Sequence, residues 1–67
     1  MRDQILYRLV SDHPLYGTAG RAYYKEEWNN FSFRDRALFE PVNIRFSDYK
    51  LIEKTDKGQI ENYLIEL

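Results

Sequence analysis

The residues best suited to acid–base chemistry are one histidine and its neighbours. His13 is the only histidine in the chain, and Ser11 and Asp12 directly precede it. An imidazole beside a hydroxyl or a carboxylate is the arrangement of a catalytic dyad. The chain has no second histidine and no cysteine, so it offers neither an imidazole pair nor a thiolate to zinc. We therefore interpret His13 as a solvated or hydrogen-bonded loop residue, and we expect no metal and no cofactor.

Two other patterns point toward a reactive or anion-binding site. Glu26 and Glu27 are adjacent carboxylates, but neighbours on a helix diverge by about 100° and cannot face one substrate. Residues 17–20 read Gly-Thr-Ala-Gly, whose amides could hold an anion, although the Gly-Lys-Ser/Thr ending of a phosphate loop is missing. A rigid pocket of roughly 300 Å³ or more is also hard to build in so short a chain. We expect no enzymatic activity.

Length and charge limit the classes of protein to which the chain can belong. Its 67 residues predict a single domain, residues 1–67, because two hydrophobic cores would need roughly 100 residues or more. The formal net charge is −1, whereas sequence-blind nucleic-acid binding is typical of basic domains. The sequence contains neither a membrane-spanning apolar run nor the apolar stretch of a signal peptide. We therefore predict a cytoplasmic protein and expect neither membrane nor nucleic acid as its partner.

Aromatic residues are the one enriched group. Six tyrosines, four phenylalanines and one tryptophan are more than so small a core can hold, so several should lie on the surface. Tyrosine and tryptophan provide rigid contact area and dominate the energetics of protein interfaces. The residues that we assign to the core are Trp28, Phe46, Tyr49, Leu51 and Tyr63. The residues that we expect at a partner-binding surface are Tyr7, Tyr16, Tyr23, Tyr24, Phe33, Arg34 and Arg36.

Two alternatives stay open for these aromatic residues. They would either cover a thin core or, interleaved with arginines, stack on the bases of single-stranded nucleic acid. The acidic balance of the chain disfavours the second alternative.

The elements that must position these side chains begin with a strand and one or two short helices. Residues 4–10 are mostly apolar, with β-branched and aromatic side chains, and predict a buried strand. Residues 18–31 carry an apolar stripe at helical spacing and favour a helix, with an extended segment over residues 21–24 as the alternative. Residues 33–39 predict another helix, because Ser32 begins a capping-box pattern.

The C-terminal half changes from a helical period to a period of two. Residues 42–46 alternate apolar and polar side chains and predict a strand with one wet face. Residues 49–55 and 59–67 predict two more strands, joined by a three-residue loop at residues 56–58 in which Gly58 is left-handed.

The register of this hairpin and the fold class follow from these elements. In the predicted register Leu51 pairs with Tyr63 and Tyr49 pairs with Ile65, which places these apolar side chains on the same face of the hairpin. The edge of residues 59–67 would then be unpaired, and an unpaired edge favours self-association. The predicted fold class is α+β: a small single domain with an N-terminal strand, one or two short helices and a C-terminal three-stranded antiparallel meander.

Two segments resemble a known family of DNA-binding proteins. Residues 13–17, His-Pro-Leu-Tyr-Gly, and residues 48–54 with the hairpin loop resemble the start and the wing of PadR-type winged-helix repressors. The resemblance implies a DNA-reading helix over residues 34–46. The side chains that it would place toward the groove are Arg36, Asn43 and Arg45. The sequence departs from that pattern where residues 42–46 alternate as a strand.

We therefore expect a small non-catalytic protein-binding module that docks an aromatic-rich surface on a larger protein or on a second copy of itself. Compact, cysteine-free, aromatic-rich domains are typical of phage or mobile-element inhibitors, including anti-defence proteins such as anti-CRISPRs. The alternatives are a winged-helix DNA-binding regulator and a small subunit of a larger assembly.

Overall fold

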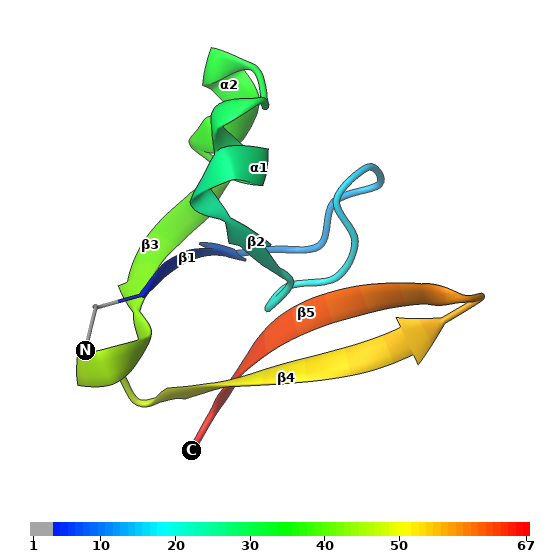
Figure 1. Ribbon diagram of the computed structural model, residues 1–67. Coiled ribbons are helices and arrows are strands. Elements are labelled where there is room, and N and C mark those ends of the chain that lie inside the picture. Colours follow the sequence, from blue (N-terminus) through cyan, green and yellow to red (C-terminus); the bar gives the residue numbers. More distant parts are fainter. Residues whose placement is uncertain (1–3) are drawn as a thin grey trace.

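Two antiparallel sheets and two short α-helices form the structure, a computed structural model that describes residues 4–67 (Figure 1). The α+β fold class is therefore confirmed. In chain order the elements are β1 (Ile5–Leu9), β2 (Ala22–Tyr24), α1 (Lys25–Asn29), α2 (Phe33–Arg36), β3 (Phe39–Asn43), the 3₁₀ helix η1 (Ile44–Phe46), β4 (Tyr49–Asp56) and β5 (Gln59–Glu66). In this described part of the chain, no helix has the length and apolar character needed to cross a membrane.

The first strand lies at the centre of the larger sheet. The strand order is β2-β1-β3, and both neighbours run antiparallel to β1. Leu6 of β1 is fully buried, and it packs with Ala22, Val42 and Leu64 in the core. Leu64 belongs to β5, so this core joins the sheet to the hairpin. The strand predicted for residues 4–10 is confirmed over Ile5–Leu9, although only Leu6 and Leu9 of it are buried.

The third strand differs from the strand predicted for residues 42–46. β3 ends at Asn43, whose side chain accepts a hydrogen bond from the Arg45 N–H and so begins η1. Phe46 lies in η1 and is 74% exposed, so its assignment to the core was wrong. The predicted three-stranded meander is wrong too, because β3 pairs with β1 and leaves β4 and β5 as a two-stranded hairpin.

Pro41 fits into β3 because of its place in the register. It lies opposite Tyr7 on an edge strand of the sheet. The Ile44 N–H donates to the Gln4 carbonyl at 3.0 Å, and such bonds alternate along an antiparallel ladder. The nitrogen of Pro41, three residues earlier, therefore faces away from β1, where its missing N–H costs no ladder bond.

The hairpin is present, but its register is shifted by one residue from the prediction. Lys57 and Gly58 have positive φ angles of 50° and 79°, the geometry of a two-residue type I′ turn. Gly58 is left-handed, as predicted. Lys57 is left-handed as well, so the loop contains two residues instead of three. Leu51 consequently pairs with Leu64 and not with Tyr63.

The pairing of β3 with β1 also changes which strand edge of the hairpin is free. Tyr49 pairs with Glu66 rather than with Ile65. The Leu64 N–H of β5 donates to the Gly20 carbonyl at 2.8 Å, so part of the edge that we predicted to be unpaired is covered. Among the described residues β4 pairs only with β5, and the outer edge of β4 is therefore the open one.

The two helices occupy the end of the molecule away from the hairpin (Figure 1). The helix predicted for residues 18–31 is limited to α1, because Ala22–Tyr24 pair with β1 as β2. The extended alternative was right for that stretch. α2 begins after Ser32, whose Oγ accepts a hydrogen bond from the Asp35 N–H at 3.2 Å, as the capping pattern predicted. The helix is shorter than the predicted residues 33–39, because it ends at Arg36 and Phe39 already belongs to β3.

Candidate partner-binding surface

Four aromatic rings pack against one another in what we call the closed cluster, which consists of Tyr16, Tyr23, Phe31 and Phe39. The centroids of contacting rings are 4.6 to 6.2 Å apart, in the tilted and edge-to-face arrangements that aromatic side chains prefer. Phe39 is 8% exposed, and the other three are half-buried. The closed cluster therefore works as a satellite of the core.

The hydroxyl groups of the closed cluster have partners within the molecule. Tyr16 donates to Asp35 Oδ2 at 2.6 Å, and Tyr23 donates to the Tyr16 carbonyl oxygen at 2.9 Å. The hydrogen bond to Asp35 is the main reason why the pKa of Tyr16 rises to about 12. Burial raises the pKa of Tyr23. Two residues that we expected at a partner surface are thus held in an internal network.

A second aromatic group lies on α1 and α2. Phe33 is 87% exposed, and it lines a hollow of about 340 Å³ together with Trp28, Arg36 and Ala37. We call these four residues the open surface. The Arg36 guanidinium carbon lies 5.5 Å from the ring centroid of Trp28 and 5.9 Å from that of Phe33, within the range of cation–π contacts.

Trp28 is held in place by two contacts. Tyr7 of β1 stacks on its indole, with ring centroids 4.0 Å apart and planes 7° from parallel. The Trp28 Nε1–H donates to the Arg36 carbonyl oxygen at 3.2 Å, which ties α1 to the end of α2. An aromatic wall that is fixed before binding loses little conformational entropy when a partner arrives.

The two arginines of α2 make no ion pair among the described residues. The carboxylate of Asp35 accepts the hydrogen bond from Tyr16, and Arg34 is exposed. The ion pairs among residues 4–67 are Arg8–Glu40 at 3.2 Å and Arg21–Glu61 at 3.4 Å. Arg34 and Arg36 therefore have no ion-pair partner among the described residues.

The structure brings together part of the predicted partner surface. Phe33 and Arg36 share the hollow, Arg34 lies on the same helix, and Tyr7 supports the site through Trp28. Outside it lie Tyr16 and Tyr23 in the closed cluster and Tyr24 against the core. We assigned Trp28 to the core and missed it as a site residue. Its indole N–H needs an acceptor, which favours the rim of a core, and this signal could have revealed it.

The loop that contains His13 uses its polar side chains to hold its own shape. His13 Nδ1 accepts a hydrogen bond from the Leu15 N–H at 3.1 Å, and Asp12 Oδ1 accepts one from the Ala19 N–H at 2.8 Å. The imidazole also lies 5.0 Å from the Tyr16 ring. His13 is a hydrogen-bonded loop residue, as interpreted from the sequence.

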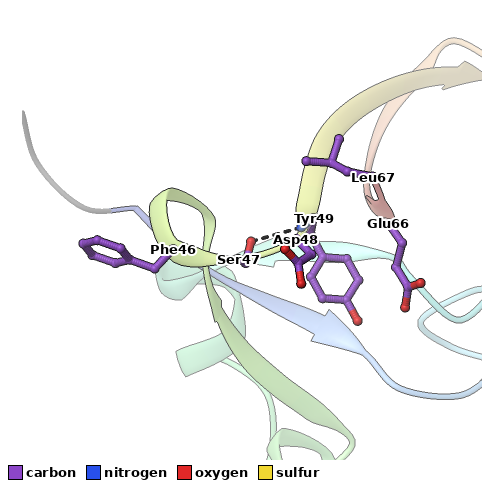
Figure 2. Close-up of a pocket in the computed structure, with 6 residues that line it drawn as sticks. All are labelled: Phe46, Ser47, Asp48, Tyr49, Glu66 and Leu67. Carbon is purple, nitrogen blue, oxygen red and sulfur yellow. Dashed lines mark hydrogen bonds between the residues drawn. The ribbon is translucent and has the colours of Figure 1, made fainter.

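A wider hollow of about 530 Å³ lies where η1 meets the ends of β4 and β5 (Figure 2). The residues that line it are Phe46, Ser47, Asp48, Tyr49, Glu66 and Leu67. Ser47 Oγ accepts a hydrogen bond from the Tyr49 N–H at 3.2 Å, and Phe46 points away from the other side chains drawn (Figure 2). The apolar side chains that line this hollow do not point toward one another, so it is a weaker candidate for a binding site than the open surface.

Comparisons with family models, with curated proteins and with solved structures found no match to this chain. The resemblance to PadR-type repressors also fails at the element that would read DNA. Residues 34–46 contain the end of α2, all of β3 and η1, where the repressor pattern requires one recognition helix.

Proposed function

We propose that this protein is a non-catalytic protein-binding module that docks its open surface on a larger protein. The observation that carries the proposal is Phe33, which is 87% exposed beside a hollow of about 340 Å³. Moving such a side chain out of water is worth roughly 1.5–3 kcal/mol. In the isolated chain Phe33 stays in water, so a partner that covered this side chain would bind with that additional favourable free energy.

The composition of the open surface supports the same function. Tryptophan and arginine are the residues most enriched among interface hot spots, and here Trp28 and Arg36 contact each other directly. Because Tyr7 already fixes the indole, little order has to be imposed when a partner binds. A compact hot spot of this kind suits a small protein that binds a much larger one.

We extend the proposal to an inhibitor of the phage or mobile-element kind, such as an anti-defence protein, acting in the cytoplasm. Its support is the small, aromatic-rich chain without cysteine, a composition that suits a reducing compartment. Self-association belongs to the same proposal, because the outer edge of β4 is open. Light scattering that finds only an 8.2 kDa species at high concentration would remove self-association.

Affinity capture with matched baits tests the proposed function. The wild-type protein, Phe33→Ser and Leu15→Ser would each be immobilised and exposed to the same host lysate. Leu15 is a suitable control because it is also apolar and 78% exposed, but lies in the loop between β1 and β2. We expect Phe33→Ser to lose the captured protein and Leu15→Ser to keep it. A partner that binds all three baits equally would overturn the proposal.

A further inference from the structure

We propose that the open surface takes an acidic polypeptide segment, with one apolar side chain in the hollow and a carboxylate on the arginines of α2. This inference rests on the proposed function and adds the chemistry of the segment that is recognised. An apolar wall and two arginines that make no ion pair among residues 4–67 lie on the same helical end. The wall would take the apolar side chain of the ligand, and the arginines would take its carboxylate.

The apolar half of the site is formed by Trp28, Phe33 and Ala37. These side chains line a hollow of about 340 Å³, which is enough for one large aliphatic or aromatic side chain. The stacked Tyr7 and the hydrogen bond from Trp28 to the Arg36 carbonyl keep the indole in one orientation. The hollow therefore exists before the ligand arrives.

The charged half of the site is formed by Arg36, with Arg34 nearby on α2. Within residues 4–67 neither guanidinium has a carboxylate within ion-pair distance. Of the three guanidinium nitrogens of Arg36, only Nε is buried without a hydrogen-bond partner, and the two terminal nitrogens are available as donors. A planar guanidinium that is packed along its stem and open at its tip is suited to a carboxylate.

The neighbouring charges favour a peptide carboxylate over a nucleic acid. Glu26 and Glu27 are exposed on α1, the helix that carries Trp28. An extended chain of phosphates would have to pass near these acids, and the whole protein has a formal net charge of −1. A peptide carries its carboxylates on separate flexible side chains, whereas a nucleic acid carries a phosphate at every nucleotide.

The fluorescence of Trp28 provides the test, because it is the only tryptophan in the chain and it lines the hollow. The probe is the peptide acetyl-Ser-Asp-Glu-Leu-Asp-Glu-Ser-amide. Its controls are one peptide with lysine for each acid, another with serine for the leucine, and a ten-nucleotide oligothymidine. We expect a saturable fluorescence change with the acidic leucine peptide and at least tenfold weaker binding of all three controls.

Two double variants of the protein distinguish an effect of Arg34 and Arg36 from an effect of positive charge elsewhere on the protein. Replacing Arg34 and Arg36 together by glutamine should weaken peptide binding at least tenfold. Replacing Lys50 and Lys57 by glutamine removes the same charge from exposed positions on the hairpin and should change binding less than twofold. Melting curves of both variants show that they remain folded.

The outcomes separate this inference from the proposed function. Equal binding of the acidic peptide by the arginine variant, or tighter binding of the oligonucleotide, overturns the acidic segment as the ligand. If the peptide produces no response while capture from the lysate still depends on Phe33, the inference fails and the proposed function stands. If capture also loses its dependence on Phe33, both fail.

Discussion

The closed cluster and the open surface both contain aromatic rings, but they differ in the partners of their polar side chains. In the closed cluster the hydroxyl of Tyr16 is bonded to Asp35, and that of Tyr23 to a backbone carbonyl. On the open surface Arg36 has aromatic neighbours but no carboxylate among the described residues. The comparison indicates that hydroxyl groups bonded within the molecule mark the satellite of the core, whereas an arginine without an ion pair among the described residues marks the proposed binding surface.

The largest expected effect is the loss of a ring from the closed cluster. Phe39→Ala removes an 8% exposed side chain that contacts the other three rings of the cluster. The expected loss of stability is about 3–5 kcal/mol, which is comparable with the whole stability of a domain of this size, roughly 3–10 kcal/mol. Urea unfolding measures it. The matched change on the open surface, Phe33→Ala, should stay within about 0.5 kcal/mol, and equal losses would erase the distinction.

A smaller effect is expected in the loop that carries Tyr16 into the closed cluster. Gly17 has a φ of +104°, and a Cβ there would lie 3.2 Å from the Arg21 side chain. Gly17→Ala should therefore cost about 1–3 kcal/mol, the usual cost of forcing a side chain into a sparsely populated backbone region. Leu15→Ala in the same loop should change stability by less than about 0.5 kcal/mol. Thermal melting that ranks the two variants in reverse would show that the cluster does not depend on this loop.

The smallest effect concerns pH. The pKa of Tyr16 is raised from 10.0 to about 12, so its contribution to stability is complete below pH 10 and is lost as the pH rises through 12. Ultraviolet titration should show one tyrosine ionising near pH 12 that is missing in Tyr16→Phe. Phe33→Ala should leave this late ionisation unchanged. A difference between wild type and Tyr16→Phe that titrates near the ordinary value of 10.0 would contradict the bond to Asp35.

The parts of the fold that depend on neighbouring residues could be predicted from the sequence. The Ser32 cap, β1 and the existence of the hairpin follow from local patterns. The pairing of β3 with β1 could not be predicted, because alternation along residues 42–46 indicates a strand without showing its partner. The predicted register of the hairpin was wrong because Lys57 has a positive φ, which is uncommon for a residue other than glycine.

The candidate site could be predicted only in part, for a related reason. Phe33, Arg34 and Arg36 stand close together in the sequence and share one short helix, so their common location was recognisable. Trp28 reaches the site through the turn between α1 and α2 and through its stack on Tyr7. That stack joins residues 21 positions apart, and the spacing of residues along the chain does not reveal it.

The most direct measurement of the central claim is the proton–nitrogen NMR spectrum of the labelled protein during titration with the partner that the wild-type bait captures. The chain has one tryptophan, so a single indole resonance reports on the hollow of the open surface. We predict that this resonance shifts or broadens together with the Arg36 amide, while the amides of Tyr16 and Tyr23 stay in place. Large shifts at Tyr16 and Tyr23 with an unchanged indole resonance would contradict the assignment of the open surface as the binding site.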